Sequence, residues 1–440
     1  MTARLTAPAF AFFLATAAAH GAGAPADPRP RQDAQGNPIR YAPTGHVSNY
    51  DEAKVGNLPL PDPLVFRDGQ PVRTPEDWRR RRAEILALYD AEIHGRVPAG
   101  VPKARSEVVA TDPAALDGIA VRKHMVVRFG TEQNGVSMNV VLFLPRNISG
   151  PVPLLVQMLF GPPPGIASAA PAPGPTKDAK GTPARMPPRE HAPIEEVIAR
   201  GWACAFLRYT EIEGDKADTH LTGIRRLALS PGQEKPADDE WGTIAAWAWG
   251  VSRITDFLAA DPAIDADRLA VIGHSRLGKT ALRIGATDER FRVIFSSCSG
   301  EMGAALARRD YGETVDDMAA NFPWQFAGNF RKYAGRWDAL PVDAHLLIAL
   351  SAPRAVFITG GTQDQWADPR GQFLAQAAAG PVWRLLGGRD LGVTELPPLD
   401  VPIVEGDLGF LYHTGGHVIT AGDWNAFFRF AARAFAQAGR

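Results

Sequence analysis

The chain has 440 residues, and 47 Lys and Arg against 48 Asp and Glu give it a formal net charge of −1. Hydrophobic residues make up 45% and charged residues 22%, the balance of an ordinary globular protein. This composition excludes a largely disordered chain, a coiled coil and a polybasic nucleic-acid binder. The two cysteines, Cys204 and Cys298, allow at most one disulfide bond, so the chain is not a disulfide scaffold.

The N-terminus has the pattern of a secretory signal peptide. Arg4 is followed by an apolar run over residues 5–18 and by small residues up to Ala24. We expect residues 1–24 to be removed on export to the periplasm or the medium, with an uncleaved anchor as the alternative. No other segment approaches about 20 apolar residues, so no membrane span is expected after cleavage.

Two further segments stand apart by composition. Residues 25–63 are polar and rich in Pro and Gly, and we expect them to wrap around a single domain formed by residues 64–440. Within that domain, residues 161–190 form a long insertion rich in Pro, Ala and Gly. A loop of this length is usually functional or mobile.

The domain is predicted to begin with a helix that Thr74 caps and that runs to Ile93. Antiparallel strands follow, and after the insertion strands alternate with helices. The predicted strands are 106–110, 120–128, 138–144, 154–159, 203–207, 269–272, 293–296 and 355–359, and the predicted later helices are 241–259, 277–286, 346–352 and 421–438. This order predicts an α/β-hydrolase fold, a three-layer sandwich with a mixed, mostly parallel central sheet.

Two motifs overlap in residues 269–280, LAVIGHSRLGKT, where a buried strand is predicted to lead into a helix. Gly273 to Thr280 match G-x-x-x-x-G-K-[ST], the phosphate-binding loop of nucleotide hydrolases. The same residues place Ser275 at a sharp turn two positions after Gly273. That is close to the nucleophile elbow G-x-S-x-G, with the second glycine displaced to Gly278. A purely structural turn is the third interpretation.

The wider sequence favours the elbow. A phosphate-binding loop normally follows the first strand of its domain, whereas at least five predicted strands precede this one. The later apolar strand at 355–359 reaches its first Asp only at position 364, too late for a magnesium ligand at the strand end. The elbow instead predicts an acid after a later strand and then a histidine, and both are present.

A serine nucleophile needs a base that a carboxylate orients. His417 follows two glycines in a predicted turn before the final helix, which is where a catalytic loop would place the base. His413 is the alternative base. His345 is expected to be structural, because it falls at the predicted start of a helix.

The acid of such a triad should follow the strand 355–359. Asp364 is closer to the end of that strand and is preferred to Asp368. Because Asp368 precedes a proline, capping of the next helix explains it well.

Two cations follow the candidate nucleophile. The backbone N–H of Arg276 is the natural oxyanion donor, and its guanidinium could add positive charge there. Lys279 lies one helical turn beyond Ser275 and could reach a substrate hydroxyl or carboxylate. Trp324 and Trp366 are candidates for stacking on a sugar, although core packing is the commoner role of tryptophan.

These residues resemble the glucuronoyl esterases, carbohydrate esterase family 15. The nucleophile motif of that family is G-C-S-R-x-G-K, and residues 273–279 read GHSRLGK, with His274 in place of Cys as in a bacterial-type member without a disulfide there. The resemblance covers about residue 50 to the C-terminus. It is carried also by the segments 50–63, 311–314, 321–324, 329–330, 350–354, 364–369, 415–417 and 423–424.

The resemblance implies hydrolysis of the ester between 4-O-methyl-glucuronic acid of glucuronoxylan and lignin alcohols. It also implies a role for each of six residues: attack by Ser275, general base for His417, oxyanion stabilisation by Arg276, binding of uronate hydroxyls by Lys279, and sugar contacts for Glu313 and Trp366. A solvated carboxylate is the plain alternative for Glu313.

The resemblance leaves the acid open. Fungal-type members carry a Glu after the strand that follows the nucleophile, where this chain has Cys298. Some bacterial-type members use an acid after the later strand, which favours Asp364. Glu301 is close to the missing position and is a possible substitute.

Two other functions compete with this one. The first is an acetylxylan or other carbohydrate esterase on the same scaffold, and the second is a carbohydrate-binding pseudoenzyme with a misplaced triad. No metal cluster stands out among the ten histidines and no cofactor is implied. We expect a monomer whose partner is glucuronoxylan or a lignin–carbohydrate ester, with no nucleic acid.

Overall fold

The computed structural model describes residues 29–57, 59–166 and 191–437. The expected signal peptide and most of the insertion at 161–190 lie outside these residues. Within the described part, no helix combines the length and the apolar character needed to cross a membrane.

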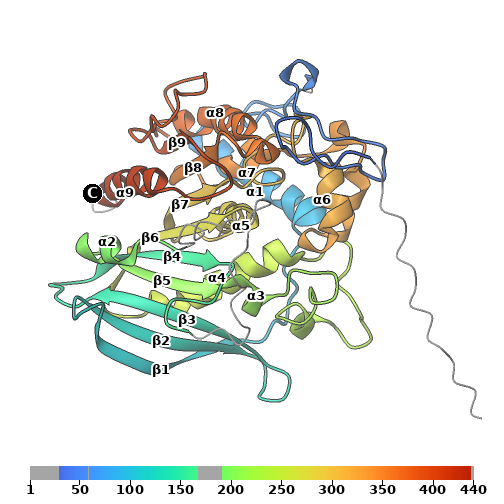
Figure 1. Ribbon diagram of the computed structural model, residues 1–440. Helices are drawn as coiled ribbons and strands as arrows, with labels where there is room; N and C mark the ends of the chain where they lie inside the picture. The colour runs from blue at the N-terminus through green and yellow to red at the C-terminus, as the bar shows by residue number, and fades with distance from the viewer. Residues whose placement is uncertain (1–28, 58, 167–190, 438–440) are drawn as a thin grey trace, which may run out of the picture.

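A nine-stranded sheet runs through the centre of the molecule in the order β1-β2-β3-β5-β4-β6-β7-β8-β9 (Figure 1). The pairs from β1 to β5 are antiparallel, and the pairs from β5 to β9 are parallel. The strands are β1 (Ala104–Ala115), β2 (Ala120–Phe129), β3 (Val136–Pro145), β4 (Val152–Leu159), β5 (Ala203–Arg208), β6 (Ile264–His274), β7 (Phe291–Ser297), β8 (Ala355–Gly361) and β9 (Leu408–His413). The sheet is therefore mixed and mostly parallel, as predicted.

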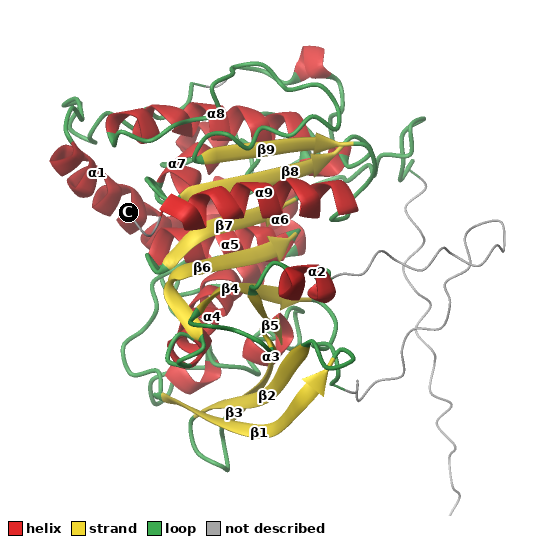
Figure 2. Cartoon of the chain, turned by 90° about the vertical axis from the view of Figure 1, so that its left-hand side faces the viewer, coloured by secondary structure: helices red, strands yellow, loops and turns green. Residues whose placement is uncertain are grey.

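Helices cover both faces of the sheet. Figure 2 shows α2 and α9 in front of it and the larger group of helices behind, and each face has its own hydrophobic core. The helices are α1 (Pro75–Leu88), α2 (Ile194–Ala199), α3 (Tyr209–Ile212), α4 (Thr243–Leu258), α5 (Arg276–Thr287), α6 (Val315–Asn321), α7 (Ala344–Ala349), α8 (Pro369–Leu385) and α9 (Ala421–Gln437). This three-layer arrangement is the predicted α/β-hydrolase fold.

Local sequence explains several of these elements. Thr74 caps α1 in a capping box with Asp77, as predicted, and a π-helical turn continues α1 to Ile93. β4 is buried along its whole length, in keeping with its continuous apolar sequence.

The helix α8 and the strand β9 were not among the predicted elements. α8 contains Pro381, Gly371 and Gly380, and glycine and proline disfavour a helix on propensity alone. Phe373 and Trp383 on α8 are completely buried against the sheet. Tertiary packing therefore outweighs propensity here. β9 has only six residues and contains Gly409, which weakens the strand signal of its sequence.

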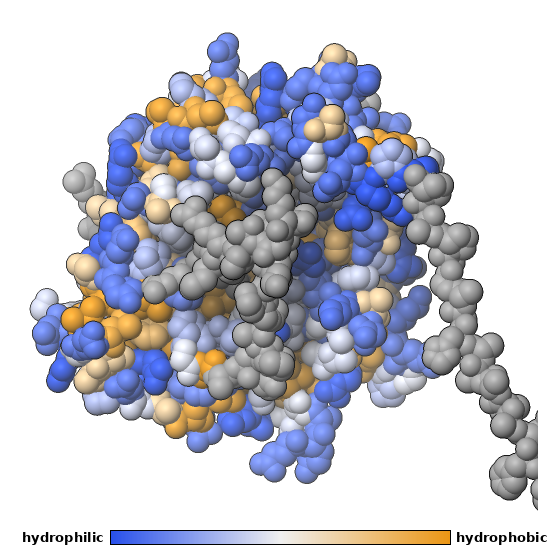
Figure 3. Space-filling view, viewed as in Figure 1, coloured by the Kyte–Doolittle hydropathy of each residue, from blue (hydrophilic) through white to orange (hydrophobic). Residues whose placement is uncertain are grey.

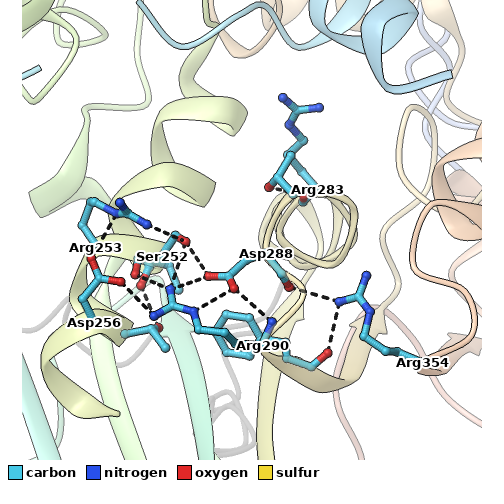
Figure 4. Close-up of polar contacts among 11 residues, drawn as sticks. Ser252, Arg253, Asp256, Arg283, Asp288, Arg290 and Arg354 are labelled. Carbon is cyan, nitrogen blue, oxygen red and sulfur yellow. Dashed lines mark hydrogen bonds and ion pairs between the residues drawn. The ribbon is translucent and has the colours of Figure 1, made fainter. Parts of the chain in front are cut away.

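A polar cluster joins the helices to the N-terminal ends of the parallel strands (Figure 4). Asp288, between α5 and β7, accepts hydrogen bonds from the Arg290 side chain and from Ser252 on α4. Arg354, just before β8, donates to the backbone carbonyls of Asp288 and Phe291 at 3.0 and 3.1 Å. The cluster thus joins α4, α5, β7 and β8 at the end of the sheet away from Ser275.

The edge strand β1 is exposed and irregular. Val108 and Val109 are 49% and 43% exposed, but bulges interrupt the pairing of β1 with β2, and Pro113 lies near its end. Such features oppose edge-to-edge association. On the face seen in Figure 3, hydrophobic residues are interspersed with hydrophilic ones over the described surface.

Candidate active site

Ser275 occupies a sharp turn between β6 and α5. Its backbone has φ 58° and ψ −129°, a strained conformation for a residue with a Cβ and the one expected of a nucleophile elbow. Its N–H donates to the carbonyl of Ser297 on β7 at 2.8 Å, which fixes the turn to the neighbouring strand. Arg276 is the first residue of α5, so its own N–H has no partner within the helix.

The two glycines of the motif are required by close backbone approach. A Cβ on Gly273 would lie 1.9 Å from the carbonyl oxygen of Leu277, and one on Gly278 would lie 2.9 Å from Cβ of Ser299. The second glycine is therefore placed where α5 packs against the segment after β7. This explains why it stands one position later than in the common motif.

His417 and Asp364 meet beside the turn. His417 lies in the loop between β9 and α9, and its Nδ1 is 2.7 Å from Oδ2 of Asp364, which follows β8. The Asp364 side chain is 5% exposed, whereas that of His417 is 42% exposed. A carboxylate accepts, so Nδ1 carries the proton and Nε2 is left as an acceptor.

Half-buried His274 and buried Cys298 lie beside this pair. The ring of His274 lies 4.5 Å from that of His417, centroid to centroid, and burial, followed by the charge of His417, lowers the pKa of His274 to about 3. His274 is therefore neutral at ordinary pH. Burial, followed by the charge of Asp364, raises the pKa of the Cys298 thiol well above its usual value. Cys298 thus stays a thiol and is a poor competing nucleophile.

The remaining candidate bases and acids lie elsewhere. His345 is buried on α7 and contacts the carbonyl of Pro61 at 2.7 Å, in keeping with its expected structural role. His413 is buried 3.7 Å from Asp423. Asp368 caps α8 by accepting from the N–H of Gly371, as predicted.

Glu301 is buried but does not reach the histidine. No hydrogen bond or ion pair joins it to His417 within the described residues, and its Oε1 has no hydrogen-bond partner there. Burial, followed by the charge of Asp343, raises the pKa of Glu301 well above its usual value.

Asp215 holds the guanidinium of Arg276. Arg276 Nη1 lies 2.5 Å from Oδ2 of Asp215, which is buried in the loop after α3. The indole Nε1 of Trp324 also donates to this carboxylate at 2.9 Å, so Trp324 supports Arg276 and is absent from the cleft wall. Two more side chains donate to Asp215, those of Tyr209 and Gln325. No sequence pattern points to Asp215, which is one acid among several in a loop.

Lys279, Glu313 and Trp366 form a second network. Lys279 Nζ donates to Oε2 of Glu313 at 3.0 Å and to the carbonyl of Glu301 at 2.5 Å. Trp366 Nε1 donates to Oε1 of Glu313 at 3.1 Å. The Glu313 side chain is only 11% exposed, so it is not the solvated carboxylate of the plain alternative.

These side chains line one cleft of about 500 Å³. Its lining includes Ser275, Arg276, Lys279, Cys298, Glu313, Asp364, Trp366 and His417. Both cations that follow Ser275 are paired with a carboxylate, Arg276 with Asp215 and Lys279 with Glu313. The two pairs carry little net positive charge. Arg276 keeps guanidinium donors that suit oxygen atoms, whereas the third donor of Lys279 Nζ has only the weakly accepting Met318 sulfur, at 3.4 Å.

Among the described residues, one group could offer metal ligands: Cys298 Sγ, an Asp364 oxygen and a His417 nitrogen lie within 4.8 Å of one another. The group fits a metal poorly. A thiol must lose its proton to bind, which the raised pKa of Cys298 opposes, and the Asp364–His417 hydrogen bond uses the ligand atoms. Cys204 and Cys298 are both free and buried.

Comparison with known proteins gives consistent matches. A family model described as glucuronyl esterase, fungi, matches residues 236–387. The carbohydrate esterase MZ0003 from an unknown prokaryotic organism is 37% identical over 399 residues, which is 87% of this chain and 91% of that protein. A 4-O-methyl-glucuronoyl methylesterase of Phanerochaete carnosa is 28% identical over 342 residues, 75% of this chain and 73% of its own.

The solved structures agree. A glucuronoyl esterase from Solibacter usitatus superposes with a TM-score of 0.80 at 39% identity, covering 87% of this chain and all of that chain. Both the sequence and the structural likeness extend over most of the domain, well beyond the serine motif. The resemblance found in the sequence is thereby confirmed, and the phosphate-binding interpretation of residues 273–280 is excluded. The chain belongs to carbohydrate esterase family 15, the glucuronoyl esterases, and is a carboxylic ester hydrolase.

Proposed function

We propose that this protein is an exported serine esterase that hydrolyses the ester between 4-O-methyl-glucuronic acid of glucuronoxylan and lignin alcohols. The observation that carries the proposal is one cleft that joins Ser275 and the His417–Asp364 pair to the wall of Lys279, Glu313 and Trp366. Relatives of this chain bear the name 4-O-methyl-glucuronoyl methylesterase. The proposed substrate extends that chemistry to a lignin alcohol as leaving group.

In the first half of the reaction, Nε2 of His417 takes the proton of the Ser275 hydroxyl as Oγ attacks the ester carbonyl. The oxyanion that forms accepts from the N–H of Arg276 at the positive end of α5. His417 then returns the proton to the departing alcohol oxygen, and the uronoyl group stays on Ser275 as an acyl-enzyme.

In the second half, His417 takes a proton from water, and the hydroxide oxygen attacks the acyl carbonyl. The bond to Ser275 Oγ breaks, and His417 returns the proton to that oxygen. Asp364 stabilises the imidazolium in both halves and keeps Nε2 facing the reacting atoms. The 4-O-methyl-glucuronic acid group of the xylan leaves the enzyme as a free carboxylic acid, and the serine is regenerated.

The sugar half of the substrate is assigned to the second network. A pyranose packed on the half-buried face of Trp366 would present hydroxyls to Lys279 and Glu313. Because these two are already paired, they can donate and accept without adding net charge. That suits a uronate ester, which is itself uncharged at the reacting carboxyl.

Export is proposed from the N-terminal pattern of residues 1–24. A polymeric cell-wall substrate lies outside the cell, so the location agrees with the proposed chemistry. Mass spectrometry of the mature N-terminus from a secreting host tests it, with cleavage near Ala24 expected.

The first test of function compares benzyl glucuronate with acetylated xylan, using the wild type and Ser275→Ala. We expect turnover of the glucuronate and a loss of about 10³-fold or more in Ser275→Ala, because only that hydroxyl can form the acyl-enzyme. Release of benzyl alcohol, followed by chromatography, is the measurement.

Other outcomes would revise the proposal in different ways. Turnover of acetylated xylan alone would keep the mechanism and replace the substrate. Turnover that survives in Ser275→Ala would contradict the mechanism. Binding without any turnover would favour the pseudoenzyme.

A further inference from the structure

The N-terminal segment 32–50 is built onto the domain beside the cleft. It folds back on itself through bridges between Gln32 and Pro38 and between Tyr41 and Val47. Tyr50 Oη holds its turn by donating to the carbonyl of Pro38 at 2.7 Å. In Figure 1 the segment, in blue, runs past α6.

Contacts with the segment before α6 fix its position. His46 Nε2 lies 2.9 Å from Oδ1 of Asp310, and Asn49 Nδ2 donates to the carbonyl of Asp310 at 2.6 Å. The carbonyl of Asn49 accepts from the N–H of Gly312 at 2.8 Å. Gly312 adjoins Glu313, so the segment is tied directly to the backbone that carries the sugar side of the cleft.

The segment forms part of the cleft wall. Gly36, Asn37, Pro38 and Arg40 line the same cavity as Ser275. The guanidinium carbon of Arg40 lies 5.9 Å from the ring centroid of Trp366. Arg40 therefore stands on the Trp366 side of the cleft.

The charges in the cleft single out Arg40. Arg276 is paired with Asp215, Lys279 with Glu313, and His417 with Asp364. No ion pair joins the exposed Arg40 guanidinium to any carboxylate in the described parts of the chain. Among the described residues that line the cleft, Arg40 is thus the cation whose donors are uncommitted.

We propose that Arg40 is a substrate-binding residue that the N-terminal segment adds to the sugar side of the cleft. Its ligands are hydroxyl and ether oxygens of the uronic-acid saccharide that packs on Trp366, and the inference rests on the proposed function. A planar guanidinium with five N–H donors can contact two neighbouring sugar oxygens at once. Without the N-terminal segment, the cleft would present Trp366 without this guanidinium beside it.

The test measures KM and kcat for benzyl glucuronate in the wild type, Arg40→Ala, Arg40→Lys and Arg31→Ala. Arg31 is an exposed cation immediately before this segment and does not line the cleft, so its variant is the control for a general charge effect. We expect Arg40→Ala to raise KM about 5- to 20-fold with a much smaller change in kcat. Arg40→Lys should recover only part of the loss, because it lacks the planar fork.

Each outcome decides a different point. Unchanged KM in Arg40→Ala, with active wild type, overturns the role of Arg40 and leaves the proposed function intact. An equal rise in KM in Arg31→Ala overturns it too, because a general charge effect would then suffice. Absence of wild-type turnover overturns both. Thermal unfolding of Arg40→Ala at the wild-type temperature excludes misfolding as the cause of a raised KM.

Discussion

Asp364 and Glu301 are both buried, yet their carboxylates have opposite surroundings. Asp364 accepts the Nδ1–H of His417 at 2.7 Å, whereas Glu301 has an oxygen without a hydrogen-bond partner and a pKa that burial raises. A buried carboxylate without partners favours its neutral form. Such a group is unsuited to stabilising an imidazolium. The contacts therefore favour Asp364 as the triad acid.

Exchanging each acid for its amide separates the two candidates. Asp364→Asn should lower kcat for benzyl glucuronate by about three to four orders of magnitude, because the amide favours the wrong tautomer of His417. Glu301→Gln should keep kcat within about threefold, since no contact joins it to His417. Steady-state kinetics measure both. A larger loss in Glu301→Gln than in Asp364→Asn would reverse the assignment.

The pH dependence of stability gives a second test of Glu301. The raised pKa of Glu301 means that the folded protein binds this proton more tightly than the unfolded chain. Its contribution to stability is therefore full below the unfolded pKa of about 4.3 and falls as the pH rises above it. The amide in Glu301→Gln does not ionise, so the variant lacks this pH-dependent loss of stability. Its free energy of unfolding at pH 7 should therefore not fall below that of the wild type.

At the scale of elements, the site depends on how closely α5 approaches β6 and β7. Ser275 stands at a positive φ where strand becomes helix, and the backbone around it leaves no room at Gly273. The helix in turn points its N-terminus at the place where negative charge develops. The position of Ser275 therefore depends on the whole turn between β6 and α5.

Gly273→Ala tests that junction. The new methyl group would lie 1.9 Å from the carbonyl oxygen of Leu277, so the turn must open. We expect loss of esterase activity and a lower free energy of unfolding, by about 2–4 kcal/mol. Gly150→Ala is the control, because its Cβ would meet nothing within 4 Å. Urea unfolding and kinetics of both variants give the comparison, and a fully active Gly273→Ala would contradict the elbow geometry.

At the scale of the molecule, the parallel strands bring distant residues to one edge of the sheet. Ser275, Asp364 and His417 follow β6, β8 and β9, and the carboxyl ends of parallel strands share an edge. The opposite end is held by the cluster around Asp288. Burial would raise the pKa of Asp288, but hydrogen bonds from Arg290 and Ser252 outweigh it and hold that pKa below its ordinary value.

This cluster predicts a pH-dependent part of the stability. Because the folded-state pKa of Asp288 is lowered, its contribution is present above the unfolded pKa of about 3.9 and is lost as the pH falls through the folded value. Asp288→Asn should lower the free energy of unfolding by about 3 kcal/mol at pH 7 and by less below pH 4. Asp256→Asn, which removes a more exposed partner of Arg290, should cost less than about 1 kcal/mol. Urea unfolding across this pH range measures both, and a constant difference would contradict the assignment.

The sequence by itself determined the order of most strands and helices, the elbow at Ser275 and the later positions of Asp364 and His417. These follow from local patterns, namely hydrophobic periodicity, capping residues and the spacing of glycine and serine. The family resemblance could also be found in the sequence, because short contiguous motifs carry it.

Only the tertiary structure decided what each side chain touches. Asp215 is 61 positions from Arg276, and Arg40 is far in sequence from Trp366, yet each pair meets in the folded protein. No local pattern reports such contacts, because they arise when loops from separate strands converge at one edge of the sheet. The fold alone therefore fixed the pairing of Arg276 and Lys279 with carboxylates and the N-terminal wall of the cleft. It also left the Glu301 carboxylate without a contact to His417.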